Sequence, residues 1–268
     1  MLEALSYEFV QNAIIAGVLV SIVSGIIGSL IVVNRMVFLA GGIAHTSYGG
    51  IGMAIYFGIP IFLGASIFAM GSAFIIAFIT LKHRYRMDTF IGLMWAIGMA
   101  IGVIFVDLTS GYSADLMSYL FGSILAVSKS DILYMSILLV ITILIISLRY
   151  RDILAVSYDA EYAKLRGINV NFFYTLILML SALVIVVAIK VVGLILVIAL
   201  LTIPVYIAEK LSSSLYGMMI LSSIFSSIFT LIGLWFSYYY DISSGASIIL
   251  VSAVSLLIFL SCERLCLN

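Results

Sequence analysis

The sequence predicts an all-α protein that crosses a membrane eight or nine times and carries one short cytoplasmic helix. Of its 268 residues, 65% are hydrophobic and only 9% are charged, whereas an average soluble domain has about 25% charged residues. The apolar residues also fall in runs of about 20, the length that a helix needs to cross the hydrocarbon core. We therefore expect a single transmembrane domain over residues 1–268.

Nine apolar runs are candidates for membrane-spanning helices. They cover residues 9–33, 36–59, 61–81, 89–108, 131–149, 172–189, 191–208, 215–236 and 242–261. Lys190 alone separates two of them, so one of the two is a partial span if the count is eight. Residues 115–128 form a shorter apolar run, which we expect to lie at the interface or to re-enter the membrane. Asp241 is a candidate N-cap for the last span.

The basic residues predict the orientation, because cytoplasmic loops are enriched in Lys and Arg. With nine spans and the N-terminus outside, only Lys129 and Lys190 of the 12 basic residues lie on the outer side. The basic loop at 82–86 and the C-terminus then lie in the cytoplasm. The charge distribution therefore favours nine spans.

Residues 157–170 have the pattern of a short cytoplasmic helix, over about 159–166. Two acidic residues, two basic residues and a glycine follow one another: Asp159, Glu161, Lys164, Arg166 and Gly167. This charge order is the one that the helix dipole favours, and glycine is typical of a helix C-terminus. So short a helix is not stable alone. It is therefore either an amphipathic connector or a docking element for a cytoplasmic protein.

The run at 36–59 contains His45, an ionisable residue near the middle of an apolar helix. Such a group is costly in hydrocarbon unless it is paired or faces a cavity. Helical spacing places Gly41, Gly49 and Gly52 on the same face, with Tyr48 beside them. These residues either leave a path or pocket around the imidazole or allow close helix packing. The spacing leaves both interpretations open.

Several kinds of chemistry find no support in the sequence motifs. The sequence has no G-x-x-x-x-G-K-[ST] phosphate-binding loop, and neither H-E-x-x-H nor C-x-x-C, which would indicate a zinc site. The net charge is zero, so nothing favours nucleic acid. The only two cysteines, Cys262 and Cys266, are too few for a disulfide framework. We expect no enzymatic activity and no tightly bound cofactor.

Four segments, in order along the chain, resemble the membrane permease subunits of ATP-binding cassette (ABC) importers for zinc, manganese and iron. The segments are residues 34–54, 115–131, 157–168 and 191–208. They contain a histidine before a small-residue run, a Leu-Phe-Gly segment, an acidic segment that ends in glycine, and a Val-Gly…Pro helix. Their order along the chain makes the resemblance specific.

The resemblance implies inward transport of a divalent metal ion, driven by ATP hydrolysis in a partner subunit. It also implies a second permease subunit (the same chain or a sister chain), two cytoplasmic ATP-binding subunits and an extracytoplasmic solute-binding protein. The location would be the plasma or inner membrane. The helix at about 159–166 would be the coupling helix that docks on the ATP-binding subunit, and His45 would be a transient ligand in the pore.

Gly41 departs from the family pattern, which has an acidic residue one turn before the histidine. Loss of this carboxylate removes an oxygen ligand of the kind that manganese prefers, whereas zinc accepts nitrogen ligands. The sequence therefore leaves open which metal ion is transported. One alternative is an ABC permease for a metal chelate or a cobalamin-like substrate. Alternatives of another class are an intramembrane enzyme and a structural membrane protein.

Overall fold

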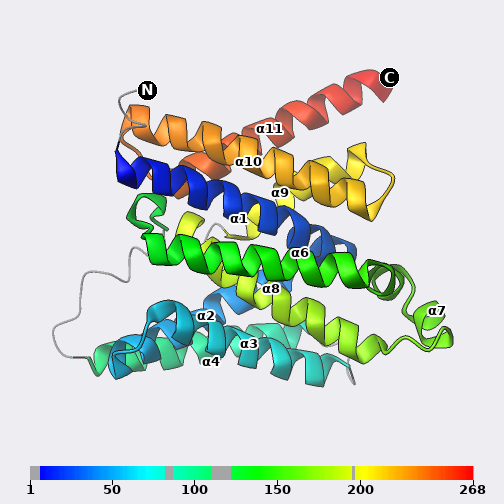
Figure 1. Ribbon diagram of the computed structural model, residues 1–268, viewed down its shortest axis with the longest axis horizontal. Helices are drawn as coiled ribbons and strands as arrows, with labels where there is room; N and C mark the ends of the chain where they lie inside the picture. Colours follow the sequence, from blue (N-terminus) through cyan, green and yellow to red (C-terminus); the bar gives the residue numbers. More distant parts are fainter. Residues whose placement is uncertain (1–6, 82–86, 110–121, 195–196, 268) are drawn as a thin grey trace. The chain divides into compact units, whose positions relative to one another are not determined.

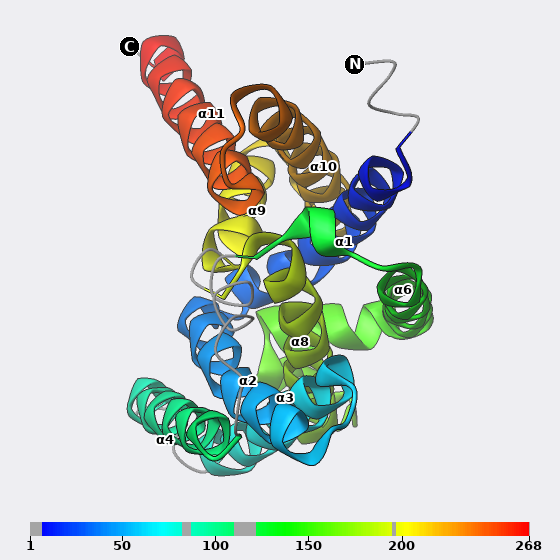
Figure 2. The same ribbon diagram turned by 90° about the vertical axis from the view of Figure 1, so that its left-hand side faces the viewer.

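The computed structural model describes residues 7–81, 87–109, 122–194 and 197–267, and the regular structure in this part of the chain is helical (Figures 1 and 2). The elements are α1 (Glu8–Val33), α2 (Val37–Phe57), α3 (Ile61–Thr80), α4 (Met87–Asp107), the 3-10 turn η3 (Ile124–Ala126), α6 (Lys129–Tyr158), α7 (Ala160–Leu165), α8 (Val170–Val192), α9 (Val197–Leu211), α10 (Leu215–Tyr240) and α11 (Ser244–Leu267). Each of the nine predicted runs overlaps one helix. The all-α class is confirmed.

Seven helices in the described part of the chain are long and apolar enough to cross a membrane: α1, α3, α4, α6, α8, α10 and α11. The other two long helices differ for separate reasons. Helix α9 has only 15 residues and contains Pro204, whereas α2 is long enough but carries five glycines and His45 among its 21 residues. The protein is therefore a polytopic membrane protein, and the count of eight or nine spans stays a prediction.

Several helix boundaries differ from the predicted runs, and α6 in particular continues past a kink at Arg149 to Tyr158. Two of the differences have a clear local cause. Helix α8 continues through Lys190 to Val192, and the chain turns at Gly193, whose φ is 86°. Glycine adopts this left-handed backbone without the steric cost of a side chain, so it ends the helix where a lysine does not. Asp241 is the C-cap of α10, with φ of 53°, and the prediction that it is the N-cap of the last span is wrong.

The chain forms two compact units, the first of which comprises Met1–Val32, Ser118–Leu139 and Ala188–Asn268. Within it, α9, α10 and α11 pack on one another. Helix α1 meets α10 through hydroxyl groups. The Ser21 and Thr230 hydroxyl oxygens are 2.8 Å apart, and Ser222 donates to the Gly25 carbonyl over 2.8 Å. Small residues and hydroxyl groups of this kind are typical of helix contacts in membranes.

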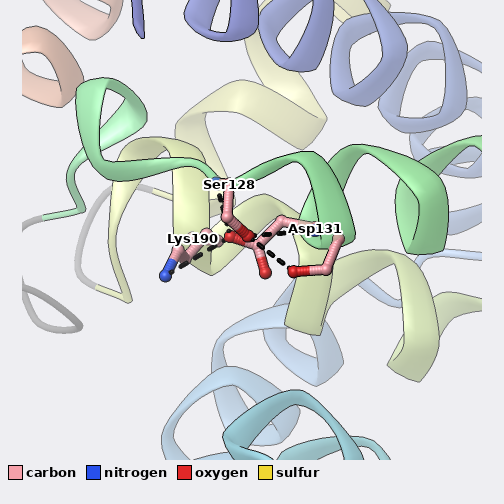
Figure 3. A network of polar contacts seen from close by, with 4 residues as sticks. Ser128, Asp131 and Lys190 are labelled. Atoms are coloured by element: carbon pink, nitrogen blue, oxygen red, sulfur yellow. Dashed lines mark hydrogen bonds and ion pairs between the residues drawn. The ribbon is translucent and has the colours of Figure 1, made fainter.

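A polar network joins the start of α6 to the end of α8 in this unit (Figure 3). The Ser128 N–H donates to Asp131 Oδ2 over 2.9 Å, and the Asp131 N–H donates to Ser128 Oγ over 3.3 Å, which makes a capping box. Lys190 Nζ lies 3.8 Å from Asp131 Oδ2. The Lys190 carbonyl also accepts from the Ser123 N–H over 3.2 Å. Lys190 thus holds the C-terminal part of the 115–128 segment, whose residues 115–121 lie outside the described residues.

The second unit comprises Val33–Met117 and Val140–Val187. Helices α2, α3 and α4 lie side by side in it (Figures 1 and 2). Where α2 and α4 come closest, the residue numbers of the contacting pairs increase in the same direction along both helices. They pair Gly42 with Ile91, Gly49 with Gly98, and Gly52 with Gly102. The two helices therefore run parallel and lie alongside each other over this length.

Glycine is required where α4 meets α2, because the two backbones are in contact. A Cβ atom at Gly102 would lie 2.6 Å from the Tyr48 carbonyl oxygen, and one at Gly98 would lie 2.6 Å from Thr46 Cα. The Gly-xxx-Gly spacing of α4 thus acts as a small-residue contact of the kind that lets membrane helices approach closely.

We predict that Gly102→Ala destabilises the protein by about 1–3 kcal/mol, because the added methyl group overpacks the contact with Tyr48. Thermal unfolding of the purified protein in detergent measures this as a lower midpoint. Gly92→Ala is the matched control in the same helix, because nothing lies within 4 Å of its Cβ position. It is expected to leave the midpoint unchanged or to raise it. Equal midpoints for the two variants would contradict the close contact.

Candidate functional site

Helix α2 places His45 half-buried on the side that faces α4. The Nδ1 atom lies 2.8 Å from the Gly41 carbonyl oxygen. A carbonyl oxygen only accepts hydrogen bonds, so Nδ1 carries the proton in this contact. In the neutral ring Nε2 then has a free lone pair, and it is the nitrogen that can bind a metal ion. Gly41, although it lacks a carboxylate, thus determines which nitrogen of His45 is available.

The imidazole of His45 stacks on the indole of Trp95 from α4. The ring centroids are 3.8 Å apart and the planes are 27° from parallel. Sequence analysis did not find Trp95, because its contact with His45 joins distant parts of the chain. The Gly-xxx-Gly spacing at 98 and 102 is the signal that could have placed α4 against α2.

The other predicted residues on this face of α2 take part in helix packing. Gly49 faces the Gly98 carbonyl, and Gly52 faces the backbone of Gly102. Tyr48 is buried, with an exposed fraction of 6%, and its carbonyl also contacts Gly102. Space beside Gly49 and Gly52 is therefore filled by α4. A pore-lining role for these residues and a ligand role for His45 stay predictions.

Among the described residues, no three side chains of His, Cys, Asp or Glu come together as a possible metal site. Cys262 is a free, exposed cysteine in α11, and the side chain of Cys266 lies outside the described residues. Among the described residues of one chain, His45 is thus not part of such a cluster.

The second predicted site is α7, whose observed limits agree with the predicted helix at about 159–166. Asp159 is the N-cap, and its Oδ1 accepts from the Tyr162 N–H over 2.9 Å. At the other end, Gly167 has a φ of 76°. The N–H groups of Gly167 and Ile168 donate to the Lys164 and Ala163 carbonyls, each over 3.0 Å. This pair of bonds is a Schellman motif, so both ends of a very short helix are capped.

The outer surface of α7 combines apolar and charged side chains. Leu165 is 88% exposed, and the exposed Tyr162 ring lies 5.9 Å from the Arg166 guanidinium carbon. The charged side chains of Glu161, Lys164 and Arg166 are also exposed. A groove of about 420 Å³ lies beside the helix, and it is lined by Ala160, Glu161, Lys164, Ile168, Asn169, Val170 and Asn171. An exposed leucine beside aromatic and arginine side chains is typical of a protein-binding surface.

A side-chain hydrogen bond connects the segments that carry the two sites. Asn34, just before α2, donates through Nδ2 to Ser157 Oγ over 3.0 Å. Ser157 lies in the last turn of α6, two residues before the α7 N-cap. Figure 1 shows α7 as a separate short helix in the connection from α6 to α8. The bond therefore ties the start of α2 to the segment that leads into α7.

We predict that Asp159→Ala destabilises α7 by about 1 kcal/mol, because the Tyr162 N–H loses its cap. Hydrogen–deuterium exchange should be several-fold faster at Tyr162, Gly167 and Ile168. Asp159→Asn is the control, since asparagine is an equally good N-cap, and it should exchange nearly as slowly as the unmodified protein. Unchanged exchange in Asp159→Ala would show that the cap contributes nothing.

Comparison with known proteins finds relatives along almost the whole chain. A profile model of the ABC 3 transport family matches residues 6–263. The chain is 46% identical over 264 residues to the uncharacterized membrane protein slr2045 of Synechocystis. That alignment covers 98% of this chain and 94% of that protein. It is 36% identical over 250 residues to the manganese transport system membrane protein MntC of Listeria monocytogenes, and the alignment covers 93% of this chain and 89% of that protein.

A solved structure, PsaBC from Streptococcus pneumoniae in complex with Fab, has a similar fold. The TM-score is 0.87 at 33% sequence identity, and the match covers 96% of this chain and 93% of that chain. Sequence and fold therefore point to the same group of membrane proteins.

Proposed function

Because the chain belongs to the ABC 3 transport family, we propose that it is the membrane permease subunit of an importer that moves divalent metal ions into the cell. The observation that carries this proposal is the 36% identity to a manganese transport system membrane protein over 93% of the chain. Manganese is therefore the first ion to test, with zinc and iron next. ATP hydrolysis belongs to a partner subunit, and this chain is a transport subunit rather than an enzyme.

His45 serves in this proposal as a transient ligand for the ion. The bond from Nδ1–H to the Gly41 carbonyl supports this role, since metal-binding histidines usually donate their other ring N–H to a carbonyl or carboxylate. A single imidazole binds weakly, and conduction requires a site that releases the ion readily. The missing carboxylate at Gly41 makes the site weaker for an oxygen-preferring ion.

The remaining parts of the importer follow from the same proposal. The functional unit contains a second permease subunit, two cytoplasmic ATP-binding subunits and an extracytoplasmic solute-binding protein. Helix α7 lies in the cytoplasm and docks on an ATP-binding subunit, with the N-terminus of the chain outside. Its two caps and its exposed Leu165 suit it to act as a preformed docking element. The Asn34–Ser157 bond then carries its movement to α2.

We predict that His45→Ala reduces metal uptake at least tenfold, because the ion loses its imidazole ligand. Uptake of Mn²⁺ and of Zn²⁺ by cells that carry the complete importer measures this, and copurification of the ATP-binding subunit checks assembly. His83→Ala, which changes the only other histidine, is the matched control and should transport normally. Unchanged uptake in assembled His45→Ala would leave His45 as a packing residue.

We also predict that charge reversal in α7, by Glu161→Lys or Arg166→Glu, uncouples ATP hydrolysis from transport. Both side chains are exposed, so the change acts on the docked partner rather than on the fold. The measurement is the number of ATP molecules hydrolysed per metal ion transported, in vesicles with the reconstituted importer. Arg151→Glu, an exposed charge outside α7, is the control. Normal coupling in both α7 variants would remove the docking role.

A further inference from the structure

We propose that Trp95 is a positioning residue for transport: its indole holds the His45 imidazole in the orientation that leaves Nε2 free for the ion. The proposal rests on the proposed function, since it takes His45 to be a ligand. Two contacts restrain the His45 ring, one at its edge and one at its face. Together they restrict the ring more than either does alone.

The first restraint is the hydrogen bond from Nδ1–H to the Gly41 carbonyl, over 2.8 Å. Rotating the ring by half a turn would place a carbon at this carbonyl and lose the bond. The bond therefore selects which nitrogen points away from the helix. It acts at one edge only, so it leaves the ring free to tilt about the bond.

The second restraint is the stack on Trp95. With centroids 3.8 Å apart and planes 27° from parallel, the indole covers one face of the imidazole at van der Waals distance. Tilting of the imidazole about its bond to Gly41 would drive one edge into the indole. The indole thus supplies the restraint that the hydrogen bond lacks.

The position of Trp95 is itself determined by the glycine contacts between α2 and α4. One turn before Trp95, Ile91 lies against Gly42, and one turn after it, Gly98 lies against the backbone of Thr46. Sliding α4 along α2 would move Ile91 away from Gly42 and bring a side chain of α4 against the backbone of Thr46. The register therefore holds the indole over the imidazole.

The stack differs from an ordinary core contact because it is not fully covered. Trp95 is 40% exposed and His45 is half-buried, whereas aromatic residues that only fill a core are more completely buried. Trp235, the only other tryptophan, is 44% exposed and stacks on Tyr239 in the other unit, with centroids 5.8 Å apart. It resembles Trp95 in exposure but not in its neighbour, and it is therefore the matched control.

The first test compares the Mn²⁺ dependence of uptake by the complete importer in Trp95→Ala, Trp95→Phe and Trp235→Ala. We expect Trp95→Ala to raise the half-saturating Mn²⁺ concentration about tenfold, the loss typical of a residue that orients a metal ligand. The maximal rate should change much less. Trp95→Phe keeps an aromatic face and should recover most of the affinity, and Trp235→Ala should leave uptake unchanged. A lower maximal rate with an unchanged half-saturating concentration, or no recovery by phenylalanine, would overturn the proposal.

The second test uses the fluorescence of Trp95 in the full chain, purified in detergent without its importer partners. In Trp235→Phe, Trp95 is the only tryptophan. Titration with Mn²⁺, and not with Mg²⁺, should change its emission saturably, and the change should disappear in Trp235→Phe/His45→Ala. If uptake requires His45 but Trp95 emission does not respond to Mn²⁺, or still responds without His45, the positioning role is wrong and the proposed function stands. If His45→Ala leaves uptake unchanged, the ligand role of His45 fails, and the positioning role fails with it.

Discussion

Backbone contact between α2 and α4 is the constraint on which the arrangement around His45 depends. Gly49 and Gly52 of α2 face Gly98 and Gly102 of α4 so closely that a side chain at Gly102 would overlap the Tyr48 backbone. In lipid, helices gain little from burying apolar surface, so close packing of this kind supplies much of their association. The same contact aligns the two helices in parallel and holds an aromatic ring against the imidazole.

Several polar side chains inside the apolar helices are satisfied by nearby groups, which matters because hydrocarbon offers no water. His45 donates to a carbonyl of its own helix, and Thr46 does the same to Gly42 over 2.6 Å. In the other unit, Lys190 is balanced by Asp131, which also closes the capping box of α6. These bonds accommodate polar side chains within apolar helices.

The two candidate sites have opposite physical characters, and both suit a permease. A single half-buried imidazole offers a weak site that an ion can leave. Helix α7, by contrast, is capped at both ends and presents exposed leucine, tyrosine and charged side chains, which suits lasting contact with a protein. The Asn34–Ser157 bond joins the segments that carry them. The two candidate sites are thus linked within one unit of the chain.

The sequence by itself determined the helical class, the place of each long helix and the two ends of α7. These features depend on local chemistry: apolar runs of sufficient length, a capping aspartate at 159 and a glycine at 167. It also singled out His45, because an ionisable residue stands out in an apolar run. Only the tertiary structure decided what lies beside that histidine: Trp95 on one face of the ring, with Gly49 and Gly52 in close contact with α4. The physical reason is that contact between α2 and α4 depends on their register, and residues far apart in the chain carry no local signal of how they align.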